Sequence, residues 1–185
     1  MLRKHTAIAI LAACSLTYAG SALVQEMMMP KPTQEHATIM KSVGDWEGTI
    51  TMHLPGMPST PNKAKETVTA FGGFWATSEF SCDFMGMPYQ GHGCHGYDQN
   101  TGKFTGTWID NMSSYLSVME GEYIEGEGLV MTWEAPDMTG QMAPHKSVRV
   151  GDDNAYTMTF WTGEQKSMVI DMKRVGAKAM EAGAK

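Results

Sequence analysis

GDWEGTITMHL, residues 44–54, is the stretch of this sequence that indicates the fold most clearly. Apolar side chains such as Ile50 and Met52 alternate there with polar ones, and a period of two is typical of a β-strand with one buried face. The residues before it suit a short helix that Thr33 caps, that runs to about Val43 and that Gly44 ends. We therefore expect a short helix followed at once by a half-buried strand.

Nine further short segments with strand-like patterns follow along the chain. They are separated by turn compositions, for example at residues 98–102 and 152–154. The expected strands are 64–71, 74–84, 89–97, 103–110, 115–123, 129–135, 146–150, 155–162 and 166–174. Such a series predicts an all-β sandwich or barrel. We expect an antiparallel up-and-down barrel of about ten strands with a short N-terminal helix, because closure removes unpaired edges.

The N-terminus has the layout of a secretory signal peptide. Arg3 and Lys4 precede an apolar run, small residues follow it, and cleavage is expected after Ala22 or after Ala19. The run is too short for a membrane-spanning helix, which needs about 20 apolar residues. We expect a signal peptide at 1–22, a linker at 23–32, the barrel domain at 33–175 and a flexible tail at 176–185.

A second interpretation of the N-terminus depends on Cys14. Residues 11–14, Leu-Ala-Ala-Cys, match a bacterial lipobox, in which the cysteine is lipidated and becomes the first mature residue. Apolar character continues past Cys14, which favours simple secretion. We expect an exported protein, periplasmic or secreted. The alternative, an outer-membrane lipoprotein anchored through Cys14, stays open.

The charge balance excludes some partners. The chain has a formal net charge of −6, and without residues 1–22 it keeps 12 basic and 20 acidic residues, a net charge of −8. A strongly acidic domain repels nucleic acid and anionic lipid surfaces. We therefore expect no nucleic-acid partner, and membrane anchoring only if Cys14 is lipidated.

Four stretches resemble a bacterial family, domain of unknown function 1579, which is lipocalin-like. They are residues 44–48, 72–75, 85–98 and 104–110. The resemblance extends over roughly residues 33–174 and implies a lipocalin-like, calycin-type barrel. It implies no catalytic residues, because the family has no settled activity.

The Gly-x-Trp sequence at residues 44–46 resembles the first strand of lipocalins and related calycin barrels. In those folds a basic residue late in the barrel packs over the tryptophan. Arg174 ends the last expected strand and shares its parity with Ile170 and Met172. We expect its guanidinium to lie over Trp46, because an arginine in an inward-facing row needs a partner.

The inward-facing rows are rich in aromatic residues and methionine, of which the chain has 18. The expected lining residues are Trp46, Met52, Phe80, Trp108, Met131, Trp133, Met158, Phe160, Met168 and Arg174. The interior of a barrel of this size is either filled by side chains or holds one small ligand. We expect a small apolar or amphipathic ligand; a packed structural or interaction protein is the alternative.

Cys82 and Cys94 lie on adjacent strands of one expected hairpin. Two cysteines in an exported domain often form a disulfide, and we expect one here. A metal site, with copper as the soft candidate, is the alternative, because alternation places His92 and Cys94 on one face and Cys82 of the neighbouring strand could join them. The sequence offers no convincing fourth ligand for structural zinc.

Two further functions stay open. Haem could be bound through a histidine, and the candidates are His53, His92, His95 and His145. An enzyme is less expected than a binding protein, because the chain has no Gly-x-Ser-x-Gly, phosphate loop or His-Glu-x-x-His. Convergence of two or more polar side chains inside the barrel would favour an enzyme. No particular cofactor is predicted.

Overall fold

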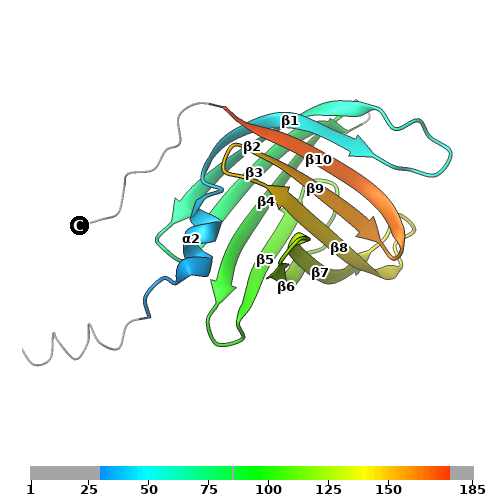
Figure 1. Ribbon diagram of the computed structural model, residues 1–185. Helices are drawn as coiled ribbons and strands as arrows, with labels where there is room; N and C mark the ends of the chain where they lie inside the picture. The colour runs from blue at the N-terminus through cyan, green and yellow to red at the C-terminus, as the bar shows by residue number, and fades with distance from the viewer. Residues whose placement is uncertain (1–29, 85, 176–185) are drawn as a thin grey trace, which may run out of the picture. The chain divides into compact units, whose positions relative to one another are not determined.

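A computed structural model describes residues 30–84 and 86–175, and it shows a closed antiparallel barrel of ten strands (Figure 1). Each strand pairs with its neighbours in sequence, and pairing of β1 with β10 closes the wall. The elements are α2 (Gln34–Met40), β1 (Gly44–Met52), β2 (Pro61–Phe71), β3 (Trp75–Phe84), β4 (Met87–Asp98), β5 (Lys103–Asp110), β6 (Ser117–Ile124), β7 (Gly128–Pro136), β8 (Met142–Gly151), β9 (Ala155–Thr162) and β10 (Gln165–Val175). The predicted fold class, with its ten strands, is confirmed.

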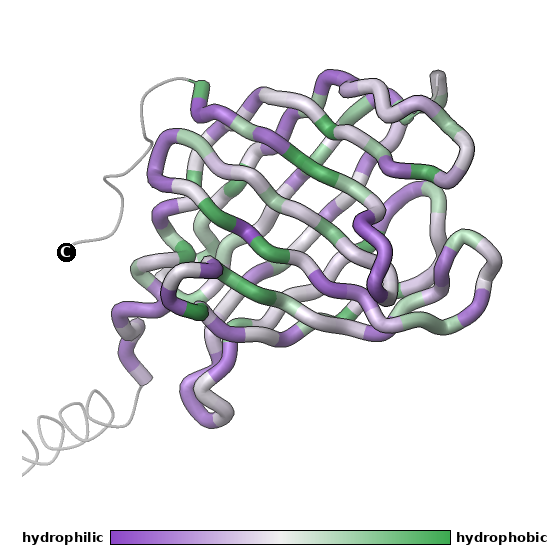
Figure 2. Tube along the Cα trace, turned by 45° about the vertical axis from the view of Figure 1, so that its right-hand side comes forward, coloured by the Kyte–Doolittle hydropathy of each residue, from purple (hydrophilic) through white to green (hydrophobic). Residues whose placement is uncertain are grey.

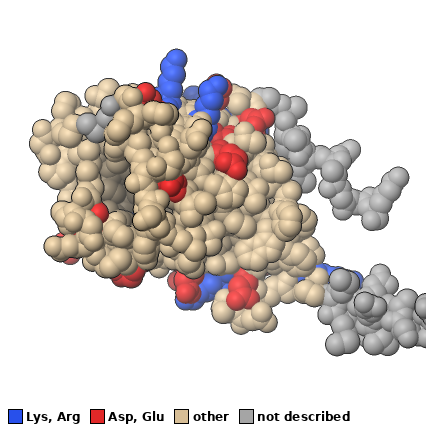
Figure 3. Space-filling model, turned by 180° about the vertical axis from the view of Figure 1, so that it is seen from behind, with Lys and Arg blue, Asp and Glu red and all other residues tan. Residues whose placement is uncertain are grey.

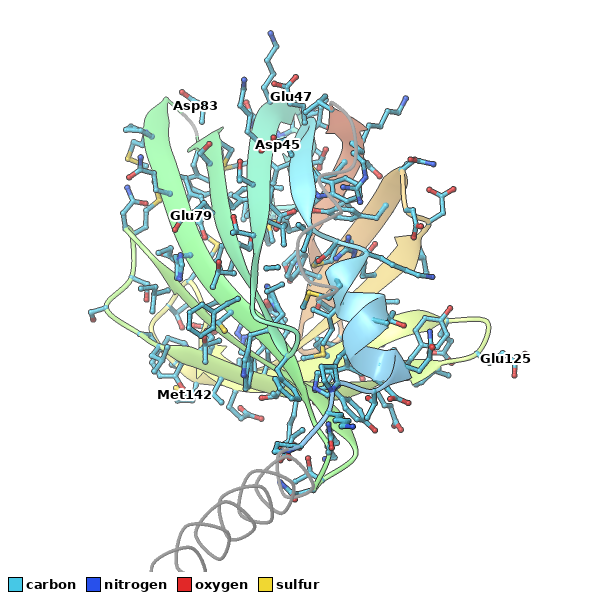
Figure 4. The ribbon with its side chains drawn as sticks, turned by 90° about the vertical axis from the view of Figure 1, so that its left-hand side faces the viewer. Asp45, Glu47, Glu79, Asp83, Glu125 and Met142 are labelled. Carbon is cyan, nitrogen blue, oxygen red and sulfur yellow. The ribbon has the colours of Figure 1, made fainter. Side chains whose placement is uncertain are left out.

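Helix α2 lies across one end of the barrel, where Glu125 projects from the neighbouring β6–β7 turn (Figure 4). The Thr33 N–H donates to Nδ1 of His36 at 3.0 Å, which caps the first turn. His36 is 1% exposed and meets the edges of the Phe74 and Tyr97 rings. The helix ends at Met40, slightly earlier than predicted, and its buried face fixes it to the barrel.

Strands β2 and β8 begin earlier than predicted, and in each the added residues include a proline. Pro61 is the first residue of β2, where a missing N–H costs little. Pro144 lies within β8, and its carbonyl accepts a hydrogen bond from the N–H of Gly163. Gly163 lies just beyond Thr162, the last residue of β9 that pairs with β8. The missing donor of Pro144 therefore costs no ladder bond.

Hydrophilic and hydrophobic residues alternate along the strands, as the hydropathy colours show (Figure 2). On β1 the inward row includes Trp46 and Ile50, which are 1% and 5% exposed. The outward row carries Glu47, whose carboxylate pairs with Lys65 of β2 at 2.8 Å. The core of this protein is therefore the interior of the barrel.

Trp46 and Arg174 close the end of the barrel next to α2. The guanidinium carbon of Arg174 lies 4.2 Å from the centre of the Trp46 ring, which confirms the predicted pairing. Arg174 also donates to the carbonyls of Asp153, Val43 and Lys41, each at 2.6 Å. These bonds join the last strand, the β8–β9 turn and the segment after α2. We call this packed end, formed by Trp46, Tyr156, Met172 and Arg174, the floor.

The predicted signal peptide, the lipidation candidate Cys14 and the predicted tail lie outside the described residues. Among the residues that are described, no helix is long and apolar enough to cross a membrane.

Candidate functional site

The inward-facing side chains differ between the two halves of the barrel. Near the floor they are buried: Trp46, Ile50, Val68, Ala76, Ser78, Phe104, Met131, Tyr156, Ile170 and Met172. Toward the opposite end Ala64, Phe80 and Ala135 are also buried, but several large side chains are only half-buried: Met52, Tyr89, Trp108, Trp133, His145, Phe160 and Met168. The latter point away from the outer surface, so their accessible area faces the interior. We call the part that they line the open half, and the surface is hollowed at this end (Figure 3).

One side of the open half is an aromatic wall built on glycines of β4. Trp108 of β5 donates through Nε1 to the hydroxyl of Tyr89 at 3.0 Å. A Cβ atom at Gly91 would overlap the indole of Trp108, and one at Gly93 would lie 2.8 Å from it. The glycines therefore leave room for the indole to lie flat against the wall.

The facing side of the open half is built from β7, β8 and β9. Trp133 stacks on the His145 ring, with centroids 5.4 Å apart and an interplanar angle of 15°. Phe160 meets Trp133 edge-on, with centroids 6.4 Å apart. Rings on both sides make the open half suitable for an apolar body of moderate size.

Polar side chains converge next to the floor. Glu66 of β2 accepts hydrogen bonds from the hydroxyl of Ser78 on β3 and from that of Tyr156 on β9, the latter at 2.5 Å. Burial, reinforced by the nearby Glu66 carboxylate, raises the pKa of Tyr156 far above its usual value. Tyr156 therefore stays protonated and donates, and Glu66 accepts.

His95 of β4 also lies in this polar group. Its Nδ1 would lie 3.0 Å from a Cβ at Gly106, and its Nε2 would lie 3.1 Å from one at Gly93. Burial lowers the pKa of His95; the Glu66 carboxylate opposes this shift, while Arg149 and His92 add to it. The imidazole is therefore neutral near pH 7. Ser78 donates to Glu66 rather than to His95, so the group is no serine–histidine couple.

Arg149 of β8 completes the polar group. It lies opposite Leu129 of β7 and Met158 of β9 and is half-buried. Its guanidinium carbon is 3.9 Å from the centre of the Tyr156 ring, a cation–π contact. The interior thus has a polar base next to the floor and an aromatic open half above it.

The predicted disulfide between Cys82 and Cys94 is not formed, and both thiols are free. In the β3–β4 ladder Cys82 lies opposite Tyr89 and faces inward, whereas Cys94 lies opposite Thr77 and faces outward. Burial raises the pKa of both thiols, so neither is an activated nucleophile. The two cysteines lie on opposite faces of the wall, too far apart to bond.

The predicted metal pair is also separated from the interior. His92 lies on the outer face, the same face as Cys94, as the alternation predicted. Its Nδ1 is 2.6 Å from the Glu79 carboxylate. Cys82 lies on the other face and cannot join them. Within residues 30–84 and 86–175, no three His, Cys, Asp or Glu residues are grouped so that they could hold a metal ion.

The predicted lining residues differ in burial. Met52, Trp108, Trp133, Met158, Phe160 and Met168 are half-buried, whereas Trp46, Phe80 and Met131 are buried. Arg174 caps the floor instead of lining the open half. The polar base was missed, although one signal was present. Glu66 stands between Ala64 and Val68 at a spacing of two, which marks an inward carboxylate.

The comparisons agree with this architecture. A family model described as "Protein of unknown function (DUF1579)" matches residues 31–174. Among solved structures, the crystal structure of Rv2717c from M. tuberculosis is similar, with a TM-score of 0.59 and 12% sequence identity. The match covers 79% of this chain and 100% of that chain. At this identity the likeness shows the fold alone. No curated protein matches the sequence.

Proposed function

We propose that this chain, which belongs to the family of proteins of unknown function DUF1579, binds a small amphipathic molecule in the open half of its barrel. The observation that carries the proposal is the half-buried state of inward-facing rings such as Trp108, Trp133 and Phe160. Large aromatic side chains in a fully packed core lose nearly all of their accessible surface. These rings keep theirs, so an apolar ligand would remove it from water.

The polar base supports an amphipathic rather than a purely apolar ligand. Glu66, His95 and Arg149 gather at one end of an otherwise apolar interior. A few convergent polar groups in an apolar pocket are the usual means of orienting a small molecule. A ligand with a polar head and an apolar body would match both regions.

The loops at the open end support entry from that side. They carry exposed apolar side chains, including Met57, Leu116 and Met138, the last 79% exposed. The loops at residues 53–60, 111–116 and 137–141 contain no Lys or Arg. Flexible methionines are common at adaptable binding surfaces.

Titration of the purified protein with N-phenyl-1-naphthylamine, an uncharged apolar fluorophore, tests this proposal. We expect saturable fluorescence enhancement at one site per chain. Ala143→Trp places a large ring into the open half, because Ala143 faces inward opposite Ala135, and we expect it to abolish binding. Met142→Trp is the matched control, because Met142 directly precedes Ala143 and its side chain is exposed (labelled in Figure 4). No enhancement with wild type, or equal loss in both variants, would contradict the proposal.

Haem coordination is a second candidate, and His95 is the observation that favours it. Of the four candidate histidines, His53 contacts Ser59, His92 contacts Glu79 and His145 stacks on Trp133. Neither ring nitrogen of His95 has a hydrogen-bond partner within the described part of the chain. Titration with haemin tests this candidate: a Soret band that is lost in His95→Ala supports it, and its absence from wild type rejects it.

Export is the companion proposal, and it rests on the N-terminal sequence. Intact-mass measurement of the protein recovered from a bacterial host that processes signal peptides tests it. A mature chain beginning at residue 23 or residue 20 supports secretion, and a diacylated chain beginning at Cys14 supports the lipoprotein. An unprocessed chain would contradict both.

A further inference from the structure

Two arginines flank Trp46, and their surroundings differ. Arg174 lies on the floor side and uses its donors on three backbone carbonyls. Arg149 lies on the interior side, with its guanidinium carbon 5.9 Å from the Trp46 ring and 3.9 Å from the Tyr156 ring. Both rings are buried inside the barrel, so the side chain of Arg149 points inward.

The guanidinium of Arg149 has no polar partner within residues 30–84 and 86–175. The ion pairs in that part of the chain involve outer-face residues: Lys65–Glu47, His92–Glu79 and Lys103–Glu120. No fully buried side-chain nitrogen or oxygen there lacks a hydrogen bond. The unbonded donors of Arg149 must therefore touch accessible space, and they do so beside the inward-facing rings of Tyr156 and Trp46.

The one carboxylate of the polar base is already engaged. Glu66 accepts from the hydroxyls of Ser78 and Tyr156, and it makes no ion pair with Arg149. A guanidinium stays charged at all ordinary pH values. A charged group within a protein is costly without a compensating partner. A partner from outside the chain would satisfy it, and Tyr156 already holds the guanidinium in place.

We propose that Arg149 binds the carboxylate of an amphipathic monoanion whose apolar body occupies the open half. This inference rests on the proposed function and names the class of ligand. The fork of guanidinium donors matches a carboxylate with two parallel hydrogen bonds. The nearby Glu66 disfavours a doubly charged head such as a phosphate monoester, because like charges repel strongly where water is scarce. The ligand therefore lies with its charged head toward the floor.

Displacement of N-phenyl-1-naphthylamine by a matched set of ten-carbon compounds tests the inference. Decanoate, 1-decanol and decyl phosphate share one chain and differ in the head group. On the wild-type protein we expect decanoate to compete at about tenfold lower concentration than 1-decanol, the gain expected from a charge-assisted hydrogen-bonded pair. Decyl phosphate is expected to compete less well than decanoate.

Arg149→Gln removes the proposed contact. In this variant we expect decanoate to lose its advantage over 1-decanol, while the fluorophore still binds and so reports a folded barrel. Lys146→Gln is the matched control: Lys146 lies on the same strand, but on the outer face over Trp161. It removes the same charge and is expected to keep the wild-type preference. If Arg149→Gln fails to bind the fluorophore, Arg149→Lys replaces it. We expect this variant to keep a smaller preference for decanoate over 1-decanol than the wild type has.

The outcomes separate the two proposals. An unchanged preference for decanoate in the Arg149 variant, or no preference in wild type, overturns the inference while binding of the fluorophore upholds the function. Tighter competition by decyl phosphate overturns the carboxylate assignment. Failure of the wild type to bind the fluorophore or any of the three competitors overturns the proposed function itself.

Discussion

Arg174 and Arg149 show how the surroundings of a residue decide its role. Both lie near the face of Trp46 and both are half-buried. Arg174 donates from each of its three nitrogens to a backbone carbonyl at the end of the last strand, so its role is to stabilise that end. Arg149 packs on the Tyr156 ring and keeps unbonded donors next to accessible space, so it can bind a ligand.

The first prediction concerns Arg174→Ala. The change removes a cation–π contact and leaves the carbonyls of Asp153, Val43 and Lys41 without these donors. We expect a loss of about 2–4 kcal/mol in the free energy of unfolding. Urea denaturation measures it. Lys173→Ala, an exposed neighbour, is the control and should change stability by less than about 0.5 kcal/mol. Equal effects would argue against a capping role.

Cys82 shows where residue-level reasoning failed. Parity within β4 correctly placed His92 and Cys94 on one face. The face of Cys82 depends instead on how β3 and β4 are aligned across their turn, and a shift of one residue reverses every side chain. The register places Cys82 opposite Tyr89, and therefore inside.

At the scale of the elements, β4 is specialised by its glycines. Gly91 and Gly93 face the interior where other strands carry large side chains, and Trp108 of β5 occupies the space that they leave. A glycine within a strand weakens it, so such a row marks a close approach of another group. Here the approaching group is an indole that lines the open half.

The second prediction concerns Gly91→Ala. The added methyl would overlap the Trp108 ring, so the indole must move toward the centre of the barrel. We expect a destabilisation of about 1–3 kcal/mol and a change in tryptophan fluorescence. The same change in a Trp108→Leu background should cost less, because the obstructing ring is gone. Equal costs in both backgrounds would contradict the packing described here.

Strands β2 and β8 show what local patterns predict about elements and what they miss. Existence and type of all ten strands followed from alternation and turn composition. The ends of β2 and β8 did not follow from these patterns, because a proline interrupts a strand only if its missing N–H faces a partner strand. Whether Pro144 faces such a partner depends on where β9 ends, which is set elsewhere in the sequence.

At the scale of the whole molecule, closure of the barrel creates the interior environment. Tyr156 and Glu66 are 90 residues apart in sequence and share a hydrogen bond across the barrel. The enclosed group also includes His95, whose neutral state is a property of the fold rather than of its neighbours in sequence.

The third prediction is a pH dependence of global stability. Burial lowers the pKa of His95 in the folded state, with Glu66 opposing and Arg149 and His92 adding to the shift. The unfolded chain, with a histidine pKa of about 6.5, then binds more protons below that pH. The contribution of His95 to the free energy of unfolding is therefore complete above about pH 6.5 and declines as the pH falls. Unfolding free energies at pH 7.5 and 5.0 measure it.

His95→Gln is the comparison for this measurement, because carboxylates elsewhere add their own acid dependence. We expect the variant to lose less stability than wild type between the two pH values. An identical loss in both proteins would mean that His95 is protonated at little cost, and would contradict its enclosed position.

The amino-acid sequence was sufficient for the features that depend on local order, the strand pattern and the barrel class, and its resemblance to calycin barrels predicted the pairing of Arg174 with Trp46. Alternation and turn residues act over a few positions, so one chain displays them directly. The polar base of Glu66, Tyr156 and Arg149, and the opposite faces of Cys82 and Cys94, emerged from the tertiary structure. They depend on strand register and barrel closure, which bring together residues from distant parts of the chain.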